Sequence, residues 1–329
     1  MNKSRRPTLK TIAKLTGLAV PTVSRALSGA EDIGQNTRER VRKVADEIGY
    51  VPNRAGLRLR TGRTFVLTLV LHTEADVMNL TARLINGAAS ALRSTRYHLN
   101  ITPYFPGEDP MRPIRHIVET HAADAIIMNQ TQPDDPRVRY LLDKGFPFAT
   151  HGRSNWSEQH AYYDFDNYTY GQLAVKRLAG LGRKSIRVVA PPMDQNYGQE
   201  LVAGASAKAE ELGVDLHVMK RVTSDDSAAT IEQEIADLFS EHVDTDGMIF
   251  ASANSCMASV TGLERAGLTI GKDIDLFSKE ALPFLQRFRP AIHSQHEEAW
   301  AAGDFLARAA IERIEKPDNP LMQFLEVPE

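Results

Sequence analysis

A pair of short helical segments joined by a glycine turn, at the start of the chain, constrains the fold most strongly. The segment from Thr8 places apolar side chains at helical spacing, and Gly17 ends it, because glycine readily takes the left-handed conformation of a tight exit. A second helix is expected from about Val20 to Leu27, with Pro21 in its first turn, where a missing N–H costs nothing. One side of this helix is apolar and the other is polar and exposed, so the two segments predict a helix-turn-helix.

A third helix and then a shorter one are predicted to follow. Asn36 and Glu39, three residues apart, resemble a capping box at the start of the third helix, and Gly49 ends it. After a break in the pattern, Asn53 is placed to cap one more helix over residues 54–61. A helix of this length is marginal in water by itself, so it is expected to need a partner to fold.

These motifs, in this order and spacing, resemble the LacI/GalR family of bacterial transcription regulators. The matching stretches are TIAKLTGLAVPTVSRAL, TRERVRKVADEIGYVPN and the short helix that carries Leu59. A lone helix-turn-helix is weak evidence, whereas three consecutive motifs are specific. The resemblance implies a helix-turn-helix DNA-binding domain over residues 1–52, a hinge helix over 53–63, and a ligand-binding and dimerisation body over 64–329.

Charge is divided unevenly between the head, residues 1–63, and the body. The head holds 14 Lys/Arg against 5 Asp/Glu, a net +9, whereas the remaining residues hold 25 against 37, a net −12. This contrast indicates a polyanionic partner for the head alone. The single cysteine, Cys256, builds neither a disulfide framework nor a thiolate metal site, and no apolar leader precedes the first helix. We therefore expect a cytoplasmic protein that needs no metal and no cofactor.

From Phe65 onward, apolar runs of strand length alternate with helical stretches. The run FVLTLVL is continuously apolar, which is typical of a strand buried on both faces. The alternation predicts an α/β body of doubly wound parallel sheets with helices on both faces, and residues 161–167 mark a crossing between two halves. The resemblance implies a two-lobed body like that of periplasmic binding proteins. Lobe one is then about 64–163 and 294–319, and lobe two about 164–293 and 320–329.

The second helix is predicted to read DNA, and the hinge helix to bend it. On the resemblance, Val20 and Pro21 meet base edges, and Arg25 on the same face can donate two hydrogen bonds to a guanine, worth about 1–3 kcal/mol of discrimination. Leu59 wedges into the central minor groove when two copies pair. A solvated surface role for Arg25 and packing within its own domain for Leu59 are the alternatives. The family often has Ser or Thr where Ala19 stands, so the second helix is expected to lack a side-chain cap. The predicted DNA-contacting residues are Thr8, Val20, Pro21, Thr22, Ser24, Arg25, Asn53, Arg54, Arg58 and Leu59.

The resemblance also places a ligand between the lobes, outside the carboxyl ends of the strands. Polar side chains there suit a hydroxyl-rich ligand, because each buried hydroxyl needs a partner. Leu201, Ser255 and Glu280 depart from the family pattern, which indicates altered ligand chemistry such as a larger saccharide. Surface or hinge packing is the alternative role for each candidate. The predicted effector-binding residues are His72, His151, Arg153, Asp166 with the adjacent Asn167, Asn254, Glu280 and His296.

No catalytic constellation is visible in the sequence. GLGRKS lacks the spacing of a phosphate-binding loop and precedes a strand, and His293 and His296 lack a third metal ligand. We therefore expect a repressor, not an enzyme, that binds a pseudo-palindromic operator and responds to a small-molecule effector, a sugar or sugar derivative, bound in the cleft. Because the chain ends without a heptad segment, a homodimer is expected rather than a tetramer. The alternative is a cytosolic two-lobed solute-binding protein or enzyme whose residues 1–63 do not bind DNA.

Overall fold

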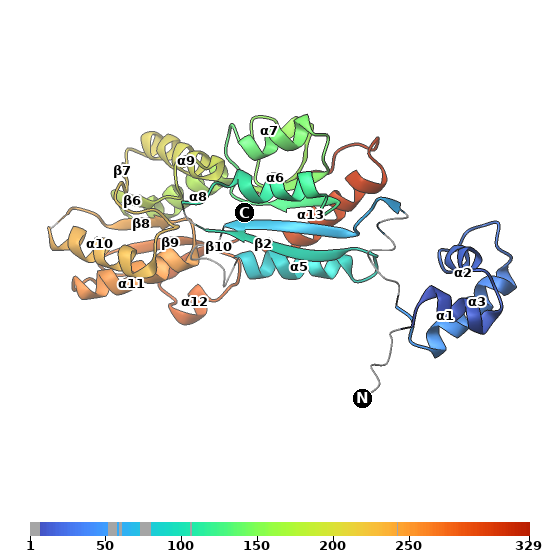
Figure 1. The fold of residues 1–329 in the computed structure, drawn as a ribbon. Coiled ribbons are helices and arrows are strands. Elements are labelled where there is room, and N and C mark those ends of the chain that lie inside the picture. Colours follow the sequence, from blue (N-terminus) through green and yellow to red (C-terminus); the bar gives the residue numbers. More distant parts are fainter. Residues whose placement is uncertain (1–6, 52–57, 59–60, 73–79, 106, 242) are drawn as a thin grey trace. The chain divides into compact units, whose positions relative to one another are not determined.

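The computed structural model describes residues 7–51, 58, 61–72, 80–105, 107–241 and 243–329. The chain falls into two compact units, Met1–Thr64, which contains the head, and Phe65–Glu329, which makes up the body (Figure 1). Asn53, Arg54 and Leu59 of the predicted DNA-contacting set, with most of the predicted hinge helix, lie outside the described residues. Arg58 is described, and it is helical and exposed.

The head is built from helices α1 (Leu9–Thr16), α2 (Val20–Leu27) and α3 (Gln35–Glu47). Their apolar faces meet in one core that includes Ile12 and Val23, both fully buried. Because each helix is short, this shared core stabilises the helices more than their intrinsic propensity does. The helix-turn-helix predicted from the sequence is therefore present.

The ends of α1 and α2 follow the prediction, whereas the start of α3 does not. Thr8 caps α1 in a reciprocal capping box with Thr11, and Gly17 ends it with a φ of 69°. Ala19 at the start of α2 makes no side-chain cap. The expected capping box at Asn36 is wrong, since α3 already begins at Gln35 and the carbonyl of Gly34 accepts its first hydrogen bonds. Glu39 instead accepts a hydrogen bond from the Gln35 side chain at 3.0 Å.

The described strands of the body form two sheets, parallel throughout, in the orders β11-β5-β4-β3-β1-β2 and β10-β9-β8-β6-β7. The first sheet consists of β1 (Val66–His72), β2 (His98–Tyr104), β3 (Ala125–Met128), β4 (Phe148–His151), β5 (Ala161–Phe165) and β11 (Gln323–Glu326). The second consists of β6 (Ser185–Val189), β7 (Asp215–Val218), β8 (Gly247–Phe250), β9 (Asp275–Glu280) and β10 (Ile292–His296). This arrangement confirms the predicted doubly wound α/β body.

Helices cover both faces of each sheet (Figure 1). On the first sheet, α5 (Ala82–Leu92) and α13 (Ala299–Glu315) pack on one face, and α6 (Met111–Thr120) and α7 (Pro136–Asp143) on the other. On the second sheet, α8 (Asn167–Gly180) and α9 (Asn196–Leu212) oppose α10 (Ala228–Ser240) and α11 (Ala253–Arg265). The body also contains two single turns, η2 (Ser157–Gln159) and α12 (Leu285–Phe288). No described helix is long and apolar enough to cross a membrane.

The expected division into lobes is wrong at two places. Residues 294–296 belong to β10, which pairs with β9 in the second sheet, so the chain returns to lobe one only after His296. The last strand, β11, pairs with β5 in the first sheet, where Tyr163 donates a hydrogen bond to Glu326 at 2.9 Å and stacks against Phe324. Lobe one is therefore the first sheet with α5, α6, α7 and α13, and lobe two is the second sheet with α8 to α12.

Candidate functional site

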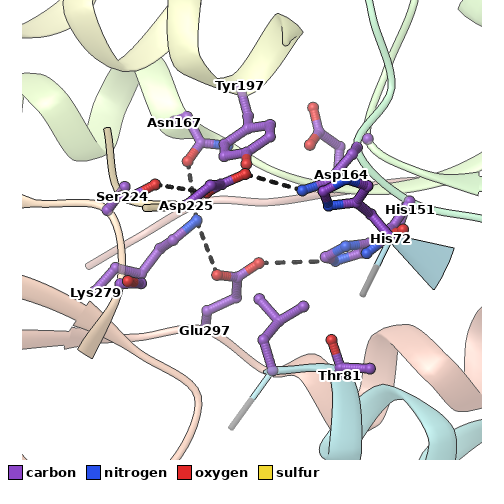
Figure 2. A pocket seen from close by; sticks show the side chains of 16 residues that line it. His72, Thr81, His151, Asp164, Asn167, Tyr197, Ser224, Asp225, Lys279 and Glu297 are labelled. Atoms are coloured by element: carbon purple, nitrogen blue, oxygen red, sulfur yellow. Dashed lines mark hydrogen bonds and ion pairs between the residues drawn. The ribbon is translucent and has the colours of Figure 1, made fainter. Parts of the chain in front are cut away.

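A pocket that is partly open to solvent lies between the lobes at the carboxyl ends of both sheets (Figure 2). Lobe one contributes residues that end or follow β1, β3, β4 and β5, and lobe two contributes residues that end or follow β8 and β9. Its described lining consists of His72, Leu80, Thr81, Asn129, Gln130, His151, Gly152, Asp164, Asn167, Tyr197, Ser224, Asp225, Ala251, Ser252, Lys279 and Glu297.

A buried charge network forms one wall of the pocket (Figure 2). The Lys279 Nζ lies 2.9 Å from a carboxylate oxygen of Glu297 and donates a hydrogen bond to the Asn167 Oδ1 at 3.1 Å. Lys279 and Glu297 are only 7% and 2% exposed. The other Glu297 oxygen lies 3.7 Å from the His151 Nε2. The network therefore joins lobe one, lobe two and both segments that cross between them.

Further bonds tie the lobes together across the cleft. Arg153 of lobe one donates to Asp164 at 2.7 Å and to Glu200 of α9 at 2.8 Å. The Gln130 side chain donates to Asp225 at 3.0 Å, and Gln132 donates to Asp194 at 2.8 Å. Because these bonds run from one lobe to the other, the relative position of the lobes and the shape of the pocket are linked.

Three buried polar atoms of the pocket have no hydrogen-bond partner among the described residues: Asn129 Oδ1, His72 Nδ1 and His151 Nε2. Burial lowers the pKa of His151, so its imidazole is neutral at physiological pH even though Glu297 and Asp164 favour the charged form. A buried polar group left without a partner costs about 1–3 kcal/mol. The pocket therefore suits a ligand whose hydroxyl groups can both donate and accept.

The pKa of Asp164 is raised, whereas ion pairing usually lowers the pKa of a carboxylate. Burial raises its pKa to about 6, although the Arg153 guanidinium opposes that shift. The folded chain then binds a proton between about pH 4 and 6 that the unfolded chain, with a carboxyl pKa of about 3.9, does not hold. The contribution of Asp164 to stability therefore grows as the pH falls through this window and is lost as the pH rises through about 6.

We expect carbon-detected NMR of the aspartate carboxyls to show one resonance with a midpoint near pH 6, absent from the Asp164→Asn variant. The physical reason is the low polarity around a carboxyl that is 4% exposed. A midpoint near 4 for the resonance that this substitution removes would contradict the prediction.

The predicted effector-binding residues divide into two groups. His72 and His151 line the pocket, together with Asn167. The others are outside its described lining. Arg153 bridges Asp164 and Glu200, Asp166 caps α8 through Thr169, Asn254 lies in the first turn of α11, Glu280 accepts hydrogen bonds from the backbone of Phe284 and Leu285 and from Ser294, and His296 lies 3.1 Å from Glu298.

Several lining residues escaped the sequence analysis. Gln130 follows the apolar run of β3 at the carboxyl edge, a position that could have been noted from the pattern alone. Lys279 and Glu297 carried no local signal of their own, because a charged residue near a strand end is common on protein surfaces. Tyr197 and Asp225 lie beyond the strand ends, so only the fold brings them to the pocket.

In the head, α2 buries Val23 and Ala26 and exposes Pro21 and Arg25. Val20, Thr22 and Ser24 are half-buried on the same helix, and Thr8 is exposed at the start of α1. The Arg25 guanidinium forms an ion pair with Asp32, and the side chains of both are more than half exposed. The exposed side of α2 therefore carries an arginine beside a carboxylate.

Family models match both units of the chain. A model described as bacterial regulatory proteins, lacI family, matches residues 8–53, and a periplasmic binding protein domain matches residues 82–283. The chain belongs to the LacI family. It is accordingly a DNA-binding transcriptional regulator with a helix-turn-helix head.

Two transcriptional regulators illustrate the similarity of this chain to other proteins. The transcriptional regulator CelR of Thermobifida fusca is 27% identical over 322 residues, which cover 95% of this chain and 94% of CelR. RafR of Escherichia coli is 35% identical over 192 residues, 57% of this chain and 56% of RafR. Both relatives are HTH-type transcriptional regulators.

Solved LacI-family structures share the fold. A lac repressor dimer bound to operator and an anti-inducer has a TM-score of 0.84 at 16% identity, covering 99% of this chain and 97% of the repressor. A complex of CelR with cellobiose has a TM-score of 0.71 at 24% identity, with 98% of each chain covered.

The ion pair between Arg25 and Asp32 predicts that removing the Asp32 carboxylate raises the affinity of the head for DNA. Asp32→Ala frees the guanidinium and removes a negative charge near the DNA phosphates, so affinity for a random duplex should rise about three- to tenfold. Fluorescence anisotropy at fixed salt would measure it. Glu31→Ala is the matched control, because it removes the same charge from the adjacent position. Equal gains in DNA affinity for the two variants would mean that the net charge of the head, and not the ion pair with Arg25, determines the effect.

Proposed function

We propose that this LacI-family regulator is a repressor that binds a pseudo-palindromic operator as a homodimer and is controlled by a saccharide in the cleft between its lobes. The observation that carries the proposal is the pocket with unpartnered Asn129, His72 and His151 atoms in a chain with a DNA-binding head. A relative, CelR, has been solved with cellobiose bound, which supports a saccharide as the ligand class.

The predicted DNA contacts fit this role. Pro21 and Arg25 are exposed on α2, where they can reach base edges in the major groove. Leu59, which lies outside the described residues, is assigned the minor-groove wedge on the family resemblance. Two heads related by a twofold axis would read two half-sites, which explains why the operator is expected to be pseudo-palindromic.

The cleft couples ligand to DNA through the position of the lobes. A saccharide that donates to Asn129 and contacts His151 sits in a pocket whose lining includes a bond that joins the lobes, Gln130 to Asp225. It shifts the equilibrium between lobe positions only to the extent that it binds one of them more tightly. A ligand that favours the position incompatible with paired hinge helices releases the operator.

The full-length chain and its own upstream promoter region test the proposal. We expect tight binding in anisotropy measurements, with a log–log salt slope near −0.9 for each phosphate neutralised, and weaker binding when a suitable saccharide is added. Arg25→Ala should lose DNA binding while the saccharide still raises its melting temperature. A monomeric chain that ignores this DNA with and without saccharides would overturn the proposal.

A further inference from the structure

A second hollow, more open to solvent, adjoins the pocket. We call it the groove. It shares His72, Gln130 and Asp225 with the pocket, so the two are continuous. Its other described lining residues are Tyr104, Gly107, Glu108, Pro110, Gln132, Asp135, Pro136, Arg137, Pro192, Asp194, Gln195, Thr223 and Asp226. Both lobes contribute, so the groove belongs to the same cleft.

The pocket and the groove together are rich in carboxylates and poor in cations. The pocket contains Asp164, Asp225 and Glu297, and the groove adds four more acids: Glu108, Asp135, Asp194 and Asp226. The described lining contains one lysine and one arginine, Lys279 and Arg137. Three of these seven carboxylates are ion-paired, Asp164 with Arg153, Asp135 with Arg137 and Glu297 with Lys279, and the described lining as a whole remains net negative.

Neither cation is available to a ligand. Arg137 is 3% exposed, pairs with the fully buried Asp135 at 2.7 Å, and donates its remaining N–H groups to Tyr104 and to two backbone carbonyls. Lys279 is committed to Glu297 and Asn167. Several of the carboxylates, in contrast, accept from neutral donors only, as Asp194 does from Gln132 and Asp226 from Thr223. A phosphate or carboxylate on a ligand would be repelled here, and the described lining has no free arginine or lysine to bind it.

The continuity of the two hollows bears on ligand size. Because the two hollows share three lining residues, a ligand that fills the pocket can extend into the groove, whereas a single sugar ring in the pocket would leave the groove unfilled. The side chains of Gln130 and Asp225, bonded to each other at 3.0 Å, stand where the hollows join and offer polar atoms to a second ring. Carboxylates and amides of this kind bind uncharged hydroxyl groups well.

We propose that the effector is a saccharide of two or more rings that carries no phosphate or carboxylate, with one end in the pocket and the next ring in the groove. This inference rests on the proposed function, that the cleft binds a saccharide. It adds that the acidic lining excludes phosphorylated and acidic sugars from the regulator, which is specificity by repulsion.

Calorimetry and thermal-shift measurements on the full-length chain at pH 7.5 test the inference. The probes are the monosaccharides glucose and galactose, the oligosaccharides cellobiose, maltose, sucrose, trehalose, melibiose and raffinose, and the 6-phosphates of glucose, cellobiose, maltose, sucrose and trehalose. We expect an oligosaccharide to bind at least about tenfold more tightly than either monosaccharide, and any phosphate derivative to bind at least about 100-fold more weakly than its parent sugar.

Two outcomes would overturn the inference while leaving the proposed function standing. One is a phosphorylated sugar that binds as tightly as its neutral parent, and the other is a monosaccharide that binds as tightly as any longer sugar. If none of the probes bound, both this inference and the proposal that the effector is a saccharide would be wrong.

Charge variants of the groove provide the second readout. Asp194→Asn should raise the affinity of the phosphorylated sugar relative to the neutral one by about tenfold, because it removes a repulsive charge and keeps a hydrogen-bond acceptor. Glu108→Gln, on an exposed residue of the groove, is the alternative should Asp194→Asn fold poorly. The control is Asp318→Asn, an exposed aspartate outside the lining. An unchanged ratio in both groove variants would contradict electrostatic exclusion.

Discussion

Replacing Gly303 with alanine is expected to destabilise the body by about 3 kcal/mol, although alanine is the better helix former. Gly303 lies on α13, and a Cβ there would come 2.0 Å from the Leu84 carbonyl oxygen of α5. Gly87 of α5 is confined in the same way, because its Cβ would come 1.9 Å from the Trp300 carbonyl oxygen. The two helix backbones are therefore in direct contact, and a methyl group would force them apart.

The matched control for Gly303 is a helical glycine at which an added Cβ would contact no other atom. Gly180 ends α8, and a Cβ at this position has no neighbour within 4 Å. Gly180→Ala should be neutral or stabilise by up to about 1 kcal/mol, because alanine loses less entropy on folding. Urea unfolding followed by tryptophan fluorescence would compare the variants. A Gly303→Ala variant as stable as the parent would show that α5 and α13 can separate without loss.

Lobe two repeats this arrangement. A Cβ at Gly204 of α9 would lie 1.9 Å from the Tyr168 carbonyl oxygen, and one at Gly171 of α8 would lie 2.3 Å from the Leu201 carbonyl oxygen. Each lobe therefore contains a pair of helices in backbone contact, and lobe two has a second, since a Cβ at Gly262 of α11 would lie 2.5 Å from the Glu232 carbonyl oxygen of α10. Close packing of this kind resists deformation. A ligand-dependent change is accordingly expected between the lobes and not within them, which fits a cleft joined by separate polar bonds such as Arg153 to Glu200.

The sequence predicted the architecture well because local patterns determine it. Continuous apolar runs such as β1 indicate buried parallel strands, and the Thr8 cap with Gly17 sets the limits of α1. The last strand was assigned to the wrong lobe because residues 323–326 carry no signal of which sheet they join. That choice depends on packing between Tyr163 and Phe324, which are 161 positions apart in the chain.

The candidate site was predicted only in part, for a geometric reason. Strand ends can be located from the pattern, and His72 and His151 were found in this way. Neighbouring residues of a strand point to opposite faces, however, so a shift by one position exchanges a pocket residue for a structural one. The prediction chose Glu280, which bonds the backbone of α12, and the adjacent Lys279 lines the pocket.

Breaking the charge network around Lys279 is expected to destabilise the body strongly. Glu297→Ala leaves a buried ammonium with Asn167 as its remaining polar contact among the described residues, which should cost about 3–5 kcal/mol. Glu298→Ala is the control at the next position, where the carboxylate is 53% exposed beside His296 and should contribute less than about 1 kcal/mol. Urea unfolding at pH 7 would measure both. Similar losses for the two variants would contradict the importance of burial.

Replacing both partners separates stability from ligand response. The double variant Lys279→Met with Glu297→Leu keeps the volume of the wall and removes both buried charges, so it should recover most of the stability that Glu297→Ala loses. It also removes the Glu297 carboxylate, whose oxygens the wall offers as acceptors to a ligand in the pocket. A saccharide that raises the melting temperature of the parent should therefore have little effect on the double variant. If the double variant kept the full ligand response, the network would serve the stability of the cleft and not its recognition of the ligand.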